Sequence, residues 1–388
     1  MKEIYLDNSA TTALCEDAAK AMTETMALYG NPSSLHSAGL AAQKVVDDAR
    51  NTLGVALGVR MPKPGQLIFT ASGTEANNLA IRGCVYAKSR RVANRIITTD
   101  SEHPSVENLL RKLEEDGFEV VRISTRGGVL DMAALDKALD KNVLLVTMMM
   151  VNNETGAMYD VAKVFSAVKQ KCPDAVTHCD AVQGFMKSRF SPVSIGADMV
   201  SVSSHKIHGP KGVGALYVSA DILKQRKLVP IIYGGGQESG FRSGTENVVG
   251  IAGFRAALKE AFYGLDDAIA HMSALREYAL LKLSALDIRL NTPLGKAAPH
   301  IINFTLPSIK SETMLHYLSG EGIFVSSGSA CSSHATTPSR ALTAFGLSPA
   351  DADCSLRVSL CKHNTESDID ALVERLQMGL RVLVRVKR

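Results

Sequence analysis

Short apolar runs alternate with helix-length amphipathic segments through the first two-thirds of the chain, and this alternation restricts the fold more than any other feature. The runs with strand character are QLIFT, RIITT, EVVRIS, NVLLVTMMMV, AVTHCD and ADMVSVS. Helical patterns lie between most of them, at residues 75–87, 105–116 and 161–171. Strands and helices that alternate in this way form a doubly wound, largely parallel α/β sheet with helices on both faces. Ligands of such sheets bind at the carboxyl ends of the strands, so functional residues are expected there.

The last third of the chain has a different pattern, which indicates a second, smaller α+β domain. One long helical segment at 248–286 is followed by the strand-like run HIINFTL, a short helix at 312–319 and a final helix from Glu366. The first dozen residues continue neither pattern, and we assign them to the second domain. The expected division is a large domain over residues 15–257 and a small domain formed by residues 1–14 and 258–388.

Length, composition and charge exclude several classes of protein. The 388 residues are 46% hydrophobic, which is ample material for two cores. The formal charge of +4 is small for this length and the body of the chain has no basic run, so direct nucleic-acid binding is not expected. The N-terminus lacks the apolar segment of a signal peptide, and no window reaches the ~18 uncharged residues of a membrane span. We therefore expect a cytoplasmic protein without a membrane partner.

The cysteines do not indicate a disulfide framework or a structural zinc site. They number seven, an odd count, and contain no CxxC pair. Cys172, His178 and Cys179 are close in sequence and could be metal ligands. Cys179, however, stands in an alternating, strand-like stretch, where packing in the core is the better interpretation. No metal is expected.

Polar residues gather where the predicted strands end. They are Gly73, Thr74, His103, Asn153, Asp180, Gln183, Ser203, His205 and Lys206. Gly73 and Thr74 open a helix, whose free N–H groups and positive dipole end would hold a phosphate. Each residue taken alone could be a helix cap or a satisfied core group. Because five loops supply them at the same edge of one sheet, a single ligand site is favoured.

Lys206 and Asp180 have a definite chemical use as a pair. A lysine forms a Schiff base with an aldehyde cofactor, and an aspartate beside a pyridine nitrogen keeps that nitrogen protonated and the ring an electron sink. The pair therefore indicates pyridoxal 5'-phosphate. The imidazole of His103 could stack on its ring.

Ordered motifs run over nearly the whole chain: YLDNSATT, GNPSSLHSAG, SGTEANNLAI, EHPSV, VNNETG, CDAVQ, SSHKIHGPKGVGALY, GGGQESGFRSGTEN and SSGSAC. Together they resemble the pyridoxal-phosphate-dependent cysteine desulfurases of aminotransferase fold type I, in the class V aminotransferase family. The resemblance implies a mostly parallel seven-stranded sheet sandwiched by helices, plus a smaller α+β domain. It also implies a homodimer with shared active sites.

The resemblance implies a role for each site residue. By this resemblance Lys206 is the Schiff-base lysine, His103 stacks on the ring and Asp180 pairs with the pyridine nitrogen. Asn153 and Gln183 contact the ring hydroxyl. The implied phosphate ligands are Gly73, Thr74, Ser203 and His205, together with Thr245 from a second subunit. Arg357 matches the arginine that binds the substrate carboxylate, a use that suits a planar guanidinium. The alternative for Arg357 is a surface ion pair.

The stretch SSGSACSSH places one thiol, Cys331, among glycine and small hydroxyl residues. The resemblance implies that its thiolate attacks the sulfur of substrate L-cysteine after Lys206 has moved the α-proton. Alanine leaves and a persulfide stays on Cys331. Gly328 and the surrounding serines tolerate many backbone conformations, which suits a catalytic loop, at about residues 326–340, that delivers sulfur to an acceptor outside the pocket.

Cys331 and Arg357 are 26 residues apart (331 to 357), which resembles the subgroup with the longer catalytic loop. That subgroup implies a sulfur-acceptor protein, either an iron–sulfur scaffold or a tRNA-thiolation enzyme. The alternatives are a selenocysteine lyase and a non-catalytic scaffold subunit that retains the fold. Both Lys206 and Cys331 are present, which disfavours the scaffold. The sequence leaves open which acceptor is served and what Cys354 and Cys361 do.

Overall fold

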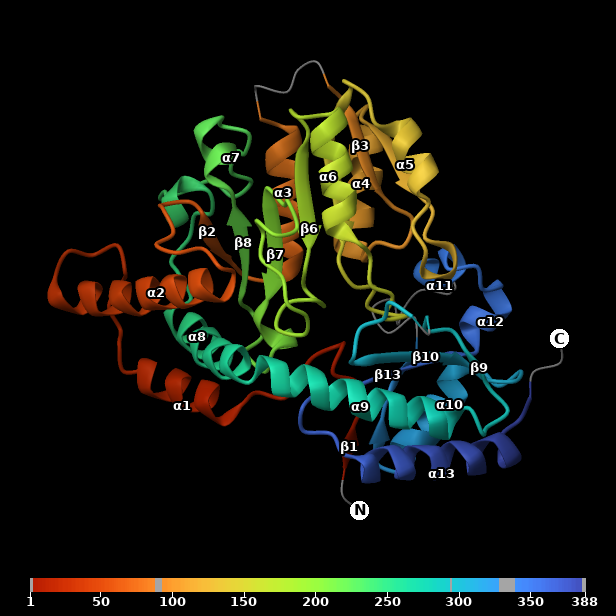
Figure 1. The fold of residues 1–388 in the computed structure, drawn as a ribbon. Helices are drawn as coiled ribbons and strands as arrows, with labels where there is room; N and C mark the ends of the chain where they lie inside the picture. Colours follow the sequence, from red (N-terminus) through yellow and green to blue (C-terminus); the bar gives the residue numbers. More distant parts are fainter. Residues whose placement is uncertain (1–2, 88–92, 294, 328–338, 386–388) are drawn as a thin grey trace.

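The computed structural model describes residues 3–87, 93–293, 295–327 and 339–385, and its largest element is a seven-stranded sheet (Figure 1). In the order in which they lie, the strands are β2 (Leu67–Thr70), β8 (Gly214–Val218), β7 (Met199–Ser203), β6 (Val176–Asp180), β5 (Val143–Met149), β3 (Arg95–Thr99) and β4 (Glu119–Ile123). Neighbouring strands are parallel except for β8, which runs antiparallel to β2 and β7. The predicted mostly parallel sheet is confirmed, with β8 as a strand that the sequence pattern did not reveal.

Helices cover both faces of this sheet, as predicted. One face carries α3 (Gly73–Val85), α4 (Pro104–Glu115) and α7 (Ala220–Lys224); the other carries α2 (Ser37–Ala56), α5 (Met132–Ala138), α6 (Val161–Lys171) and α8 (Val248–Tyr263). Successive strand residues point to opposite faces. Ile68 thus packs in the core under α3 and α4, whereas Leu67 and Phe69 pack in the core on the other side. The buried strands are apolar on both faces for this reason.

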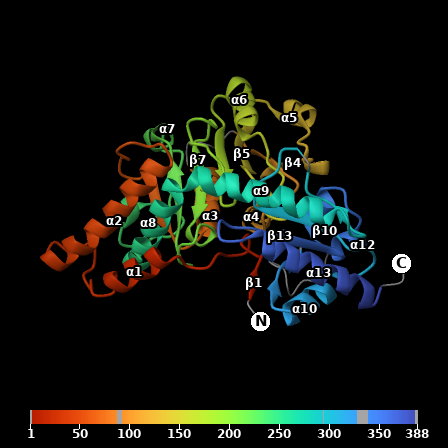
Figure 2. The ribbon, with the colours of Figure 1, turned by 60° about the horizontal axis from the view of Figure 1, so that its bottom comes forward.

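A second, four-stranded sheet is antiparallel and has its own core. Its strands lie in the order β12 (Ser326–Ser327), β13 (Ser355–Ser359), β10 (Ile301–Thr305) and β9 (Arg289–Leu290). Figure 2 brings this part forward, with α9 (Leu265–Leu283), α10 (Ser311–Gly320) and α13 (Glu366–Val382) around the sheet. The shorter elements are α11 (Arg340–Ala344), α12 (Pro349–Asp353) and the 3-10 turns η2 (Arg126–Gly128), η3 (Ser204–Lys206) and η4 (Glu238–Gly240).

The long helix expected at 248–286 is two helices, and that part of the prediction was wrong. Helices α8 and α9 meet at Gly264, which is the C-cap of α8 and the N-cap of α9. Glycine has low helix propensity because its backbone loses the most conformational freedom on folding. Because of this break, α8 packs in the core of the seven-stranded sheet, and most of the buried apolar residues of α9 pack in the core of the second sheet.

The N-terminal segment joins the C-terminal part of the chain. Strand β1 (Ile4–Tyr5) pairs in parallel with β11 (Ile323–Phe324), and Leu6 is fully buried in the core of the second sheet. Helix α1 (Glu16–Thr25) then packs against α8 beside the large sheet. The first dozen residues therefore cross from one core to the other, passing the ends of the large sheet's strands.

Two further findings concern the described part of the chain. None of its helices combines the length and the apolar character that a membrane crossing requires. It also holds no group of three His, Cys, Asp or Glu side chains placed to bind a metal ion. His178 instead bonds to the hydroxyl groups of Thr147 and Ser201, and Cys179 is fully buried.

We predict that Leu6→Ala destabilises the protein by about 2–5 kcal/mol, because the shortened side chain leaves a cavity in the second core. Leu14→Ala, at a position that is 42% exposed, is the matched control and should change stability by less than about 0.5 kcal/mol. Urea-induced unfolding followed by circular dichroism measures both changes. Equal effects of the two substitutions would contradict the burial of the N-terminal strand.

Candidate active site

A pocket of about 800 Å³ lies at the carboxyl ends of β2, β3, β5, β6 and β7. Most of the side chains singled out in the sequence line it, namely Gly73, Thr74, His103, Asn153, Asp180, Gln183, Ser203, His205, Lys206 and Arg357. Thr245 lines a different pocket, together with Ala71 and Gly212. Cys331 lies outside the described residues. The parallel strands thus deliver polar groups from five loops to one place.

One end of the pocket is shaped for an anion. Helix α3 begins at Gly73, and the first N–H groups of a helix have no acceptor within it. A Cβ atom at Gly73 would lie 2.8 Å from Val182 and 3.3 Å from Ser203, so a larger residue would close this corner. The Ser203 hydroxyl is buried without a hydrogen-bond partner in the described structure. Such a donor beside a helix N-terminus suits a phosphate.

Two histidines, His205 and His103, line the pocket. Burial lowers the pKa of His205 to about 4, and the positive charge of Lys206 adds to the effect. Burial also lowers the pKa of His103, which is the N-cap of α4. The His103 Nδ1 accepts a hydrogen bond from the backbone N–H of Ser105 at 3.1 Å. This bond orients the imidazole, which lines the pocket.

Asp180 ends β6 with both carboxylate oxygens already oriented. One oxygen accepts the backbone N–H of Val182 at 3.0 Å, and the other accepts the side-chain amide of Asn77 at 2.7 Å. The same Asn77 amide donates to the Ser105 hydroxyl at 2.9 Å. Asn77 is 1% exposed and therefore connects Asp180 to the residues that orient His103. The sequence analysis did not single out Asn77, although it follows Gly73 by one helical turn.

Lys206 extends from η3, directly after β7. Its Nζ donates to the backbone carbonyls of Ser9 and Ala10, which belong to the N-terminal segment. Gln183 reaches the same segment, since its amide nitrogen donates to the Ser9 carbonyl at 2.9 Å. The other end of the Gln183 amide lies 3.3 Å from the His300 ring. Residues 9 and 10 thus form a wall of the pocket. No local pattern in YLDNSATT predicts this role.

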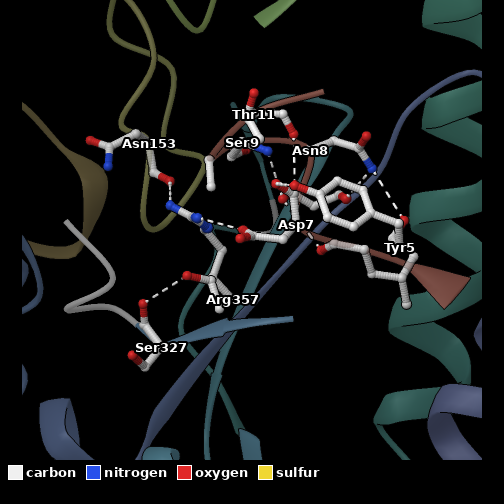
Figure 3. A network of polar contacts seen from close by, with 12 residues as sticks. Tyr5, Asp7, Asn8, Ser9, Thr11, Asn153, Ser327 and Arg357 are labelled. Atoms are coloured by element: carbon white, nitrogen blue, oxygen red, sulfur yellow. Dashed lines mark hydrogen bonds and ion pairs between the residues drawn. The ribbon is translucent and has the colours of Figure 1, made fainter. Parts of the chain in front are cut away.

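Arg357 is held between the N-terminal segment and a loop of the large sheet (Figure 3). Its Nη2 donates to the Asp7 carboxylate at 2.8 Å and its Nη1 to the Asn153 carbonyl at 2.9 Å. The Arg357 side chain is only 3% exposed, so the alternative of a surface ion pair is wrong. Its Nε has no partner in the described structure. Asp7 is a second site residue that the sequence analysis did not single out.

The described cysteines stand apart from this pocket. Burial is the main cause that raises the pKa of Cys15 to about 11, and it also raises the pKa of Cys172, Cys179 and Cys361. Cys361 lines a neighbouring cavity that shares Lys206 with the first pocket. Cys354 is buried. Because their pKa values are raised, these four thiols do not readily supply a thiolate near neutral pH.

The donor set of the pocket fits pyridoxal phosphate. The unpartnered Ser203 hydroxyl and the N-terminus of α3 suit its phosphate, the oriented Asp180 carboxylate suits a protonated pyridine nitrogen, and Lys206 suits its aldehyde. Fold and pocket together define a pyridoxal-phosphate-dependent enzyme.

The comparisons with known proteins extend this conclusion. The profile of the class-V aminotransferase family matches residues 4–372. A protein named cysteine desulfurase from Trichormus azollae is 38% identical over 96% of this chain and 92% of its own length. The cysteine desulfurase IscS of Dictyoglomus turgidum is 36% identical over 100% of this chain and 98% of its own length. The solved structure of a NifS-like protein, 34% identical, superposes with a TM-score of 0.91 over 98% of this chain and 100% of that one.

A NifS-like protein from Rickettsia africae has a similar structure, with 29% identity and a TM-score of 0.87 over 98% of this chain and 100% of that one. The chain therefore belongs to the class-V aminotransferase family and, within it, to the cysteine desulfurases. It depends on pyridoxal phosphate, and its substrate is L-cysteine.

We predict that Asn77→Ala weakens the binding of pyridoxal phosphate by about tenfold or more, because Asp180 loses a charge-assisted hydrogen bond. Asn78→Ala is the control, since the neighbouring amide donates only to backbone carbonyls of Thr74 and Ser105. Titration of the cofactor-free protein, followed by the absorbance of bound cofactor, gives both dissociation constants. Unchanged affinity in the Asn77 variant would show that this bond does not support the site.

Proposed function

We propose that this cysteine desulfurase acts as a homodimer that takes sulfur from L-cysteine onto Cys331 and passes it to an acceptor protein. One observation carries the proposal: Lys206, Asp180 and Arg357 converge on one pocket, and the described residues on either side of the Cys331 segment pair with Arg357 and bond to Glu154. When bound there, pyridoxal phosphate supplies an electron sink for the charge that develops at the substrate α-carbon.

The residues of the pocket divide between holding the cofactor and holding the substrate. The phosphate is assigned to Gly73, Thr74, Ser203 and His205, the ring nitrogen to Asp180, the ring face to His103, the ring hydroxyl to Asn153 and Gln183, and the aldehyde carbon to Lys206. Arg357 binds the substrate carboxylate, for which Asp7 and the Asn153 carbonyl fix the guanidinium. Lys206 Nζ removes the proton from the substrate α-carbon, because it is the basic group at the end of β7 that lines the pocket.

The ends of the segment with Cys331 support its place as the sulfur acceptor. Ser326 lies opposite Arg357 in the β12–β13 pairing. At the other end, the Ser339 hydroxyl donates to the carboxylate of Glu154, next to Asn153. Cys331 follows Ser327 by four residues, a length of chain that spans at most about 14 Å. The pocket is therefore within reach of the thiol.

Cys331 then acts as the nucleophile, a role that does not suit the described thiols with a raised pKa, those of Cys15, Cys172, Cys179 and Cys361. Its thiolate forms a bond to the substrate sulfur as the carbon–sulfur bond breaks. The electron pair of that bond stays with the carbon skeleton, which takes up a proton at the former sulfur-bearing carbon and leaves as alanine. The sulfur remains on Cys331 as a persulfide. The 26-residue spacing from Cys331 to Arg357 supports delivery to an iron–sulfur scaffold or to a tRNA-thiolation enzyme.

A homodimer is supported by exposed apolar side chains in the connection between α1 and α2. Tyr29 and Leu35 are each 91% exposed, and Met26 is 66% exposed. Large exposed apolar groups that cluster in this way mark association surfaces. Helix α2, which follows this connection, extends away from the large sheet in Figure 1. We also propose that the protein acts in the cytoplasm. We further propose that residues 15–257 form the large domain and that residues 1–14 and 258–388 form the small domain.

Thr245 completes the dimer proposal. It is exposed and lies outside the pocket of its own chain. Arg242, three residues earlier, forms an ion pair at 2.8 Å with Glu75 in the first turn of α3. This pair fixes the Thr245 segment beside the N-terminus of α3. We assign the Thr245 hydroxyl to the phosphate held by the other subunit.

We predict that Cys331→Ser binds pyridoxal phosphate and L-cysteine but releases no alanine, because a serine hydroxyl gives no useful anion near neutral pH. Cys361→Ser is the matched control and should keep alanine release and persulfide. Alanine assay together with mass mapping of the persulfide tests both variants. Wild-type alanine release by Cys331→Ser, with the sulfur on another cysteine, would refute the assignment.

We predict that Thr245→Ala weakens cofactor binding about tenfold, because one hydrogen bond to a charged phosphate is lost. Lys206→Ala should be inactive. In a hybrid dimer of the two variants, one site combines Lys206 from one chain with Thr245 from the other and is intact. Activity at limiting cofactor should therefore return on mixing and subunit exchange. Failure of the hybrid to recover, or a fully active monomer in sedimentation, would contradict the shared site.

A further inference from the structure

A second cavity, smaller than the cofactor pocket, lies next to it. Lys206 lines both spaces. Residues after β6 and from η3, α8, α9 and the end of β13 enclose the second cavity. One part of its wall is apolar, with Met186, Ile207, Ala261, Met272 and Leu360. No step of the desulfurase reaction described above uses this space.

Lys187 is the unusual member of this wall. Its side chain is 7% exposed, and its Nζ is buried without a hydrogen-bond partner in the described structure. A buried ammonium without a partner is costly, since burial removes its water without a replacement. Burial is also the main cause that lowers the pKa of Lys187 to about 7, and the neighbouring charge of Lys206 lowers it further. The structure thus keeps an amine where nothing yet compensates its charge.

The other charged groups of the cavity already have hydrogen-bond or ion-pair partners. Lys362 pairs with Glu260, and Lys206 donates to the carbonyls of Ser9 and Ala10. His208 is neutral at pH 7, because burial lowers its pKa to about 4. Because Lys206 is assigned to the cofactor aldehyde, two lysines, Lys187 and Lys362, remain in the loaded enzyme beside the single carboxylate of Glu260. A cation is therefore disfavoured here, and an anion is favoured.

The backbone beside Lys187 supports a built site. Met186 has φ of +54°, a conformation that is rare for a residue with a long side chain. Such conformations persist where the surrounding structure requires them, and they cluster at functional positions. Here the unusual turn places Met186 and Lys187 in the same cavity wall.

We propose that this cavity binds a small organic carboxylate, with its charged end toward Lys187 and its apolar end against Met186, Met272 and Leu360. Three features carry the proposal: a buried amine without a partner in the described structure, a cavity in which Lys187 and Lys362 outnumber the single carboxylate of Glu260, and an apolar wall. The occupant lies against Lys206, so its presence is coupled to the residue that serves the cofactor.

The test uses acetate as the probe and the dimeric enzyme with its cofactor. Sodium acetate should raise the thermal unfolding temperature of the wild type more than sodium chloride does at equal ionic strength. Lys187→Met, which is similar in size, should lose this difference, and Lys187→Arg should retain it. Lys44→Met, a lysine whose side chain is 74% exposed, is the matched control and should behave as the wild type.

The stability of Lys187→Met without acetate separates the proposal from a structural role. Its unfolding temperature should equal or exceed that of the wild type, because an uncompensated buried charge is removed. A marked loss of stability would mean that Lys187 already has a partner, and it would overturn the proposal. An acetate effect that persists in Lys187→Met would place the carboxylate elsewhere, for example at Arg357, and would also overturn it. No acetate effect in the wild type would leave water as the occupant and refute the proposal.

Alkylation of Cys361 gives the position of the bound carboxylate. Iodoacetate carries the charge that the cavity should attract, and iodoacetamide is its neutral analogue. The ratio of iodoacetate to iodoacetamide labelling, mapped by mass spectrometry, should be at least twofold higher at Cys361 than at Cys15, which does not line the cavity. Lys187→Met should abolish the excess. Equal ratios at the two cysteines would contradict the proposal, and where neither reagent labels Cys361 the acetate measurement decides.

Discussion

The buried ion pair between Arg357 and Asp7 is the interaction on which the geometry of the active site depends. Arg357 stands on β13 of the second sheet, Asp7 on the N-terminal segment, and the Asn153 carbonyl, which also accepts from Arg357, on a loop of the large sheet. A charge buried in this way is stable only when it is paired and hydrogen-bonded. The pair therefore fixes three distant segments at one point, and the pocket has its shape because they meet there.

Much of this site could be predicted from the sequence because parallel strands bring their carboxyl ends to one edge. Gly73, His103, Asp180 and Lys206 each follow a short apolar run, so the local pattern was sufficient to bring them together. The long motifs supplied the family, and the comparisons confirmed it. The roles of the individual residues remain predictions, and Cys331 lies outside the described structure.

The features that the sequence did not reveal depend on distant contacts. Asp7 lies far along the chain from Arg357, and nothing near it in sequence announces the pairing. Asn77 reads as an ordinary polar residue on a helix until Asp180 is placed beside it. Strand β8 follows a glycine-rich turn and is antiparallel, so it breaks the alternation of strand and helix. Lys187 reads as a surface lysine, and only the packing around it makes it buried.

The pairing of β1 with β11 has a consequence for the folding of the enzyme during its synthesis on the ribosome. Ile4 is synthesised long before its partner Ile323, so the pair can form only after both segments have emerged. Large domains generally fold as units during synthesis, so the seven-stranded sheet can form while the N-terminal strand still waits. Ser9 and Ala10, which hold Lys206, depend on that late closure. A nascent chain therefore has the cofactor lysine in place well before it has a finished active site.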